Sequence, residues 1–154
     1  MKILLHPKDH VVKTYSGYAI AGLYMSQYLV EKHDVALFCP VGNVFSMDTV
    51  EFQKKNGEMV GVPMYPGTGG DMYGEDVYSY HYDDFNADIM LQLADVWMLR
   101  KIPQAAASGK IRWVAYVPLD YLDPLPKKVL DTLRAAFKVV PWCMPPTQDI
   151  VTNP

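Results

Sequence analysis

Short apolar runs alternate with segments of helical periodicity from one end of the chain to the other. A strand that is covered on both faces in a parallel sheet appears in a sequence as a continuous apolar run of a few residues. By this criterion, strands are predicted at residues 3–5, 34–39, 88–93, 111–117 and 138–142. Helices are predicted between them, at residues 16–32, 78–85, 95–109 and 126–136. This alternation is typical of a parallel sheet whose strands are joined by right-handed helical crossovers.

Two of the predicted helices contain residues that are unusual in a helix. The apolar and small positions of helix 16–32 that recur at helical spacing are Tyr18, Ala21, Gly22, Met25, Tyr28 and Leu29. Glycine costs a helix interior about 1 kcal/mol relative to alanine, so Gly22 indicates a close approach of this helix to the neighbouring strand. Pro103 should kink or divide helix 95–109, because proline lacks the amide hydrogen that continues a helix.

A β-hairpin and a glycine-rich loop are predicted in the middle of the chain. Asn56-Gly57 lies between two β-like segments at 50–54 and 59–64. This dipeptide is the strongest short signal for a hairpin turn. Residues 65–76 contain four glycines and show no apolar periodicity, so a loop is expected there.

The predicted elements together define the fold class. We expect a single α/β domain at residues 1–143, with a Rossmann-like parallel sheet flanked by helices and a small β-hairpin excursion. Residues 144–154 follow as a proline-rich tail, which is too short for another packed element. The chain length of 154 residues agrees with one ordinary domain.

Composition and charge narrow the range of partners. Half of the residues are hydrophobic and 20% are charged, as in globular proteins. The net charge of −3 and the absence of basic clusters give no reason to expect nucleic acid. Cys39 and Cys143 lie far apart, which argues against a disulfide framework or zinc site and favours a reducing, cytoplasmic location. The first apolar run is too short for a signal peptide or a transmembrane segment.

The first strand, loop and helix form the main candidate for a binding site. Ser16, Gly17 and Tyr18 open the helix, where backbone amides and the helix dipole can hold an anionic group or a sugar. The loop contains neither the dinucleotide fingerprint G-x-G-x-x-G nor a P-loop, so neither dinucleotide nor Mg-ATP binding is supported. The alternative is that Gly17 serves only the turn from strand to helix, with Ser16 or Gly17 as the N-cap.

Further candidates follow the predicted strands, because open α/β sheets bind ligands beyond the carboxyl ends of their strands. His6 or His10, which flank the start of the first loop, can hydrogen-bond a sugar. Asp95 is either a cleft residue or only an N-cap, and Trp97 fits the core better than a site. Asp120, just beyond strand 111–117, is the candidate acid. The four histidines are too scattered for the three or four converging ligands of a metal site, so no metal is expected.

Five sequence features in this order resemble the N-terminal domain of GT-B fold glycosyltransferases, most closely the retaining family 4 enzymes. They are the Ile-Leu-Leu strand, Ser16-Gly17-Tyr18, Val62-Pro63-Met64-Tyr65-Pro66-Gly67 with Tyr73-Gly74, Ala87-Asp88-Ile89 leading to Asp95-Val96-Trp97, and Tyr116-Val117-Pro118-Leu119-Asp120. The resemblance implies a nucleotide-sugar donor, a sugar, lipid or protein acceptor, and no required cofactor or metal. Ser16, Gly17 and Tyr18 match the family's first cleft loop. Asp120 matches a polar cleft position, although Leu119 stands where the family often has histidine.

The resemblance also implies that this chain is half of an enzyme. In that family a C-terminal domain holds the nucleotide and two glutamates separated by seven residues, and this chain lacks such a pair. We therefore expect no turnover without a donor-binding domain, which is either truncated from this chain or separately encoded. The expected protein partners are such a separate domain or further copies of this chain. The alternative is a non-catalytic module that binds carbohydrate, nucleotide or another protein.

Overall fold

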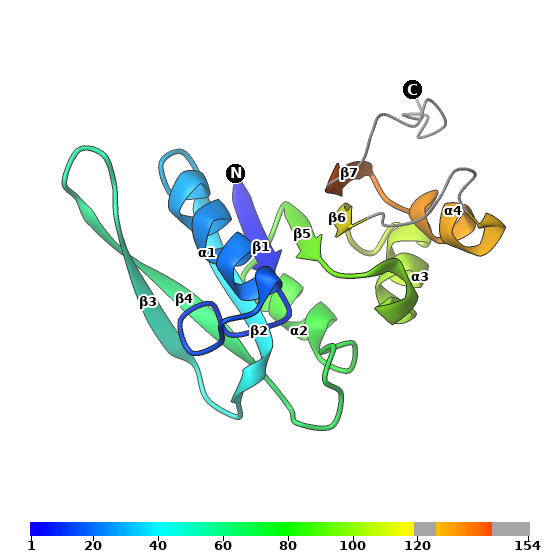
Figure 1. Cartoon of the computed structure of the whole chain (residues 1–154), viewed down its shortest axis with the longest axis horizontal. Coiled ribbons are helices and arrows are strands. Elements are labelled where there is room, and N and C mark those ends of the chain that lie inside the picture. Colours follow the sequence, from blue (N-terminus) through cyan, green and yellow to red (C-terminus); the bar gives the residue numbers. More distant parts are fainter. Residues whose placement is uncertain (119–125, 143–154) are drawn as a thin grey trace.

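The computed structural model describes residues 1–118 and 126–142, which form one sheet with helices on both faces (Figure 1). The seven strands lie in the order β3-β4-β2-β1-β5-β6-β7, and all neighbours are parallel except β3 and β4. The strands are β1 (Lys2–His6), β2 (Asp34–Val44), β3 (Asp48–Gln53), β4 (Met59–Gly67), β5 (Ile89–Leu93), β6 (Trp113–Pro118) and β7 (Lys138–Trp142). The predicted α/β class, the parallel sheet and the hairpin are confirmed.

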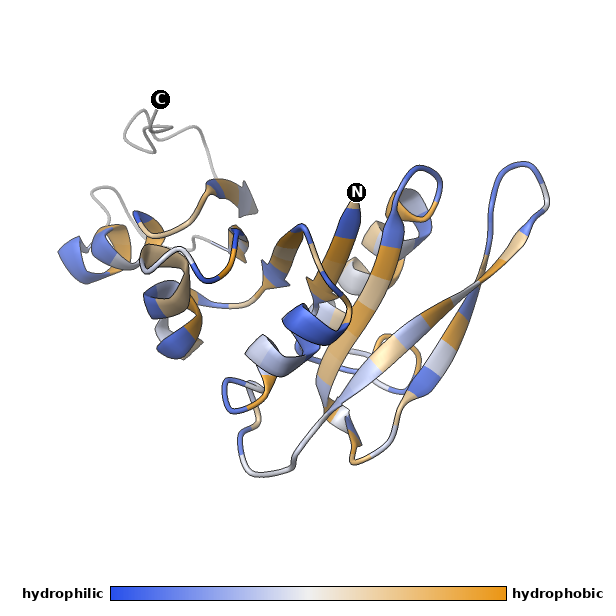
Figure 2. Cartoon of the chain, turned by 180° about the vertical axis from the view of Figure 1, so that it is seen from behind, coloured by the Kyte–Doolittle hydropathy of each residue, from blue (hydrophilic) through white to orange (hydrophobic). Residues whose placement is uncertain are grey.

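The helices cover the two faces of the sheet unequally. They are α1 (Gly17–Leu29), α2 (Tyr78–Asp84), the 3-10 turn η1 (Val96–Met98), α3 (Lys101–Ala107) and α4 (Lys127–Leu133). Along β1, Ile3 and Leu5 pack toward α1, whereas Leu4 packs into the cluster that contains α2, η1, α3 and α4. This alternation follows from the two-residue period of a strand. Figure 2 shows the hydrophobic residues concentrated in the central strands and hydrophilic ones at the hairpin tip.

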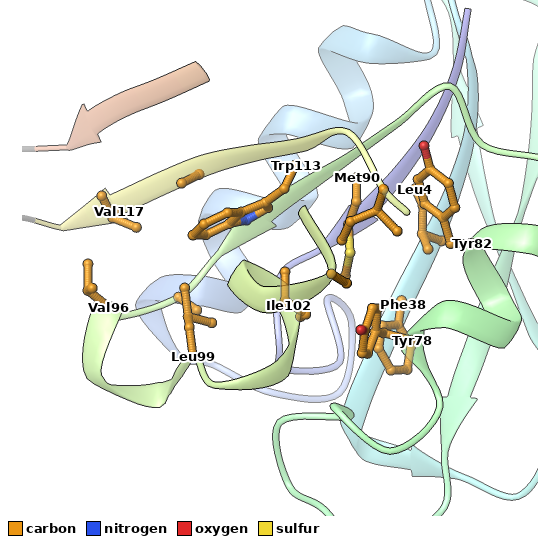
Figure 3. Close-up of a cluster of buried hydrophobic side chains, with 14 of the residues drawn as sticks. Leu4, Phe38, Tyr78, Tyr82, Met90, Val96, Leu99, Ile102, Trp113 and Val117 are labelled. Atoms are coloured by element: carbon orange, nitrogen blue, oxygen red, sulfur yellow. The ribbon is translucent and has the colours of Figure 1, made fainter. Parts of the chain in front are cut away.

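Trp113 lies at the centre of the larger cluster (Figure 3). Its side chain is fully buried on β6, with Leu99 and Ile102 contributed by the segment from η1 to α3. Burial of a large aromatic side chain removes 150–250 Å², about as much apolar area as any side chain can. The same segment leads out of β5, so this packing fixes the position of the residues that follow that strand.

Two strands extend further than predicted. β2 continues through Pro40 to Val44, and its register against β4 shifts between Cys39 and Val44. Such a bulge accommodates proline, which cannot donate to a strand ladder. β4 continues to Gly67, so the prediction of a loop from residue 65 is wrong for its first three residues. The pairing of Tyr65 with Phe38 on β2 explains the extension.

Helix α1 confirms the close approach at Gly22 and corrects one packing prediction. A Cβ atom at Gly22 would lie 2.5 Å from the Cβ of Pro7, so only glycine allows the loop after β1 to lie against the helix. The helix ends at Leu29, three residues earlier than predicted. Tyr28, expected on the buried face, is 74% exposed. Helical spacing cannot separate the edge of an apolar stripe from its centre.

The predicted helix at 95–109 is divided, as Pro103 suggested, but the break comes earlier in the chain. η1 and α3 are separated at residues 99–100, and Pro103 is the third residue of α3. The first turn of a helix tolerates proline, because its amides have no partner within the helix. Within residues 1–118 and 126–142, the helices are all too short or too polar to cross a membrane.

Candidate functional site

The strand order places a topological switch point between β1 and β5. The chain passes from β1 to β2 on one side, and it later returns through β5 on the other side of β1. His6 at the end of β1 is paired in register with Gln92 on β5. Open α/β sheets bind ligands in the crevice beyond this point. The residues that follow β1, β4 and β5 therefore define the candidate site.

A buried polar pair forms the floor of the switch point. Nε2 of Gln92 lies 2.9 Å from Nδ1 of His6 and donates to it, which leaves the ring proton on Nε2 of His6. Burial, with a smaller contribution from His81, lowers the pKa of His6 to about 3. His6 also stacks on Phe38, with the ring centroids 4.6 Å apart. It is therefore a neutral, tightly held ring at physiological pH.

Three polar atoms at this floor have no hydrogen-bond partner in the described part of the chain. They are Nε2 of His6, Oε1 of Gln92 and Nδ1 of His81. His81 is held by its other nitrogen, which lies 2.9 Å from the carbonyl oxygen of Pro66. Buried polar atoms of this kind are uncommon and gather where a structure serves function rather than stability alone. Nε1 of Trp113 in the larger core cluster is likewise buried without a hydrogen-bond partner among the described residues, but only at the floor do three such atoms belong to residues near the switch point.

Lys8 joins two loops that meet above this floor. We call them the β1 loop (residues 7–16) and the β4 loop (residues 68–77). The Lys8 ammonium lies 5.5 Å from the ring centroid of Tyr18 on α1 and 5.9 Å from that of Tyr73 in the β4 loop. The backbone of Lys8 has a φ of 66°, a left-handed conformation that is strained for a residue with a side chain. This backbone conformation lies two residues beyond the end of β1, and the Lys8 side chain supplies a cation there.

Ser16 confirms its predicted role as the N-cap of α1. Its Oγ accepts a hydrogen bond of 3.0 Å from the amide of Ala19 and donates one to the carboxylate of Asp9. Asp9 is buried. Because it accepts from the N-cap residue, its negative charge lies beside the positive end of the helix dipole. Gly17 is exposed as the first residue of the helix, and Tyr18 is half-buried. The start of α1 is thus already compensated by a carboxylate of the chain itself.

His10 makes its contacts within the β1 loop and toward β3. Its buried ring accepts from the amides of Val12 and Lys13 through Nδ1, both at 3.2 Å. Its Nε2 lies 3.8 Å from Oδ2 of Asp48. Burial and the neighbouring Lys13 lower the pKa of His10, and Asp48 partly opposes this. These contacts indicate that His10 stabilises the conformation of the β1 loop.

The predicted residues after β5 and β6 have different outcomes. Asp95 is buried at the N-cap position of η1, and its side chain makes no capping hydrogen bond. Trp97 is 59% exposed, so the expectation that it belongs to the core is wrong. η1 is only three residues long, and this turn leaves the indole on the surface. Asp120 and the predicted tail lie outside the described residues.

The sequence analysis missed the role of Glu75 in the β4 loop. Its buried Oε1 accepts from the backbone amides of Arg100, Lys101 and Ile102 at 2.7, 2.8 and 3.2 Å. A carboxylate that accepts several amides at a helix start stabilises that helix strongly. The sequence contains no local signal for this contact, because the partners lie 25 to 27 residues away. Lys8 and Gln92 were also missed, although a glutamine inside the apolar run of β5 is a visible signal.

Several large apolar side chains are exposed in the segments that follow the strands. They lie in the segments that follow β1, β2, β4 and β5, which all meet at the carboxyl edge of the sheet. We call this set the apolar rim, and its members are Val12, Tyr15, Phe45, Met47, Met72 and Trp97. Because these segments end at one edge of the sheet, the exposed apolar side chains make that edge a candidate interaction surface.

The described residues contain no group of three or more histidine, cysteine or acidic side chains that could hold a metal ion. No protein-family model matches this chain, and no curated protein matches it. The candidate site combines an apolar rim, a cation at the end of β1 and a buried polar floor.

Proposed function

We propose that this chain is the acceptor-side N-terminal half of a glycosyltransferase that moves a sugar from a nucleotide-sugar donor to an acceptor. The observation that carries the proposal is the apolar rim, whose residues follow strands at the carboxyl edge of the sheet, where Rossmann-like sheets bind their ligands. A facing donor-binding domain would cover this rim and close a cleft over it. Without that domain the chain is inactive.

Each candidate residue has a place in this proposal. Lys8 supplies the positive charge that meets the donor phosphates. Its ammonium is held by the ring of Tyr18 and by the carboxylate of Asp9, 3.9 Å away. Trp97 and Tyr15 offer exposed rings to an acceptor. The proposed role of Asp120 as a cleft acid rests on its place in the sequence, two residues after the last residue of β6. A cytoplasmic location agrees with the buried free thiol of Cys39.

Reconstitution of the complete enzyme tests the proposal. The chain is mixed with a separately expressed nucleotide-sugar-binding half of a GT-B enzyme, and sugar transfer is measured over several donors and acceptors. We expect turnover only in the mixture, and at least a tenfold loss with Lys8→Ala. Lys128→Ala, an exposed lysine on α4, is the matched control and should have no effect. If no mixture turns over while circular dichroism shows a folded chain, the proposal is wrong.

A second candidate function is supported by the start of α1. The Asp9 carboxylate lies where a phosphate would otherwise meet the helix dipole, through its contact with Ser16. This arrangement favours a non-catalytic module, in which the apolar rim binds another protein. Calorimetry against nucleotides and sugars, with light scattering and a hydrophobic dye, distinguishes the two. A strict monomer that binds no dye would remove the basis for this second function.

A further inference from the structure

We propose that a hollow between α1 and the β3–β4 hairpin binds one or two units of an uncharged saccharide. The hollow has a volume of about 290 Å³ and is lined by Tyr24, Gln27, Tyr28, Glu31, Gln53 and Lys55. It lies at the amino end of the sheet, since Gln53 pairs with Met59 at the start of β4. Figure 1 shows α1 and the hairpin that form its two sides. It is therefore separate from the switch point and does not depend on the proposed glycosyltransferase function.

Two hydrogen bonds hold the walls of the hollow together. Nε2 of Gln27 donates to the carbonyl oxygen of Gln53 at 2.7 Å, and Oε1 of Glu31 accepts from the amide of Lys55 at 3.0 Å. Each bond joins the helix to the hairpin, so the hollow is formed before any ligand arrives. Preorganisation of this kind lowers the entropy cost of binding.

Two tyrosine rings form the apolar part of the lining. Tyr24 and Tyr28 are 72% and 74% exposed, and they lie four residues apart on α1. Residues with this spacing have Cβ atoms about 5–6 Å apart on the same side of a helix. Tyrosine combines an apolar ring face with a hydroxyl that donates and accepts hydrogen bonds. A sugar ring offers the matching surface, with apolar C–H groups on its face and hydroxyls around its edge.

The charges of the lining indicate an uncharged ligand. Glu31 and Lys55 contribute one negative and one positive charge. Only one carboxylate oxygen of Glu31 is engaged by the hairpin amide, and in the described part of the chain the Lys55 ammonium forms no ion pair. Sugar hydroxyls can accept from the ammonium and donate to the carboxylate. An anionic ligand would be repelled by the Glu31 carboxylate. An apolar helix from a partner protein would also be unfavourable there, because it would bury both charges without partners.

The volume limits the size of the ligand. Pockets for small molecules range from about 300 to 1,000 Å³, and this hollow lies at the lower end. It suits one or two sugar units of a longer glycan, whose remaining units would extend into solvent. A binding site of this size gives weak affinity, so we expect dissociation constants near the millimolar range.

An NMR titration of the whole chain tests the proposal. Amide spectra are recorded with four neutral trisaccharides, namely maltotriose, cellotriose, mannotriose and N-acetylchitotriose. We expect at least one to produce saturable shifts confined to residues 24–31 and 53–55. Tyr24→Ala and Tyr28→Ala should each weaken that binding about tenfold. Tyr80→Ala is the matched control, because this exposed tyrosine lies on α2.

Three results would overturn the proposal. In the first, none of the four trisaccharides shifts an amide of the hollow. In the second, the shifts lie only at the carboxyl edge of the sheet, which would support the glycosyltransferase cleft instead. In the third, Tyr24→Ala and Tyr28→Ala abolish self-association measured by light scattering, so a second copy covers the tyrosines. The reconstitution experiment uses the chain without the tyrosine substitutions. If it showed no sugar transfer, the outcome of the NMR titration would still stand.

Discussion

The β1 loop and the β4 loop both place a buried carboxylate at the start of a helix, but they do so in different ways. Asp9 acts through the hydroxyl of Ser16, which caps α1. Glu75 contacts the start of α3 directly, through three backbone amides. The first arrangement is local, since Asp9 and Ser16 are seven residues apart. The second joins distant parts of the chain, so its loss should release the β4 loop and α3 together.

The two loops differ in how many contacts hold each of them in place. The β1 loop has several attachments, including the His10 ring and the bond from the His10 amide to the Val41 carbonyl at 2.9 Å. Within the described residues, the hydrogen bonds from the β4 loop to the start of α3 all go to the side chain of Glu75, and Tyr78, directly after the loop, adds one of 3.5 Å to the Lys101 carbonyl oxygen. We therefore expect the β4 loop to respond more strongly to one substitution.

The largest effect is expected for Glu75→Ala. It leaves three amides at the start of α3 without their charged acceptor, which should lower the free energy of unfolding by about 3 kcal/mol. For a chain of this size that corresponds to roughly 6–12 °C in melting temperature, measured by calorimetry. Glu75→Gln retains an acceptor oxygen and should lose less. Equal melting temperatures for Glu75→Ala and the unsubstituted chain would show that Glu75 does not hold the β4 loop to α3.

Low pH should lower the free energy of unfolding, because buried histidines lie next to both loops. His6 precedes the β1 loop and His81 follows the β4 loop, and burial lowers the pKa of both below the ordinary 6.5. The unfolded chain then binds more protons, so stability falls as pH drops below about 6.5. From His6, whose pKa is about 3, we expect a loss of about 2 kcal/mol between pH 7 and pH 5.

Urea unfolding across this pH range measures the effect, and His6→Gln is the informative variant. Glutamine does not titrate, so the variant should lose less stability on acidification than the unsubstituted chain. An unchanged pH dependence in His6→Gln would show that the buried ring does not control it. His10 has a pKa lowered in the same direction, so some dependence should remain.

A smaller effect is expected for Ser16→Ala. Removal of an N-cap hydroxyl costs about 1 kcal/mol, and here it also deprives Asp9 of its donor. Ser16→Asn restores a capping oxygen and should recover part of the loss. Chemical denaturation measures both variants. A loss in Ser16→Ala as large as that of Glu75→Ala would show that the β1 loop also depends on one residue.

The smallest effect is expected for Lys8→Gly. Glycine adopts the φ of 66° without strain. This offsets the loss of the 3.9 Å ion pair with Asp9 and of the contacts between the ammonium and the rings of Tyr18 and Tyr73. We expect stability within about 1 kcal/mol of the original. Lys8→Ala keeps the strain and should be less stable than Lys8→Gly. The opposite order, measured by thermal unfolding, would show that strain at Lys8 is unimportant.

Local patterns were sufficient for most of the fold. The apolar runs predicted the parallel strands, and the Asn56-Gly57 pair predicted the turn of the β3–β4 hairpin. The cap at Ser16 was visible because it depends on the geometry of one helix. Gly22 was visible as a glycine that is costly in a helix interior, although the contact that requires it is made by Pro7 in the loop after β1. The predictions failed at Tyr28 and Trp97, which belong to elements with helical spacing but are exposed.

The candidate site depended on contacts that no local pattern contains. Lys8 meets Tyr73 only because the sheet brings the ends of β1 and β4 to one edge. Glu75 meets α3 for the same reason, across 25 residues or more.

The sequence alone determined the alternation of strands and helices, the class of the sheet and the start of α1. These features arise from periodicity, propensity and capping, which act over a few residues. The tertiary structure decided which polar groups are buried together and which aromatic rings remain exposed. Those outcomes depend on the strand order, because distant segments meet only after the sheet has formed.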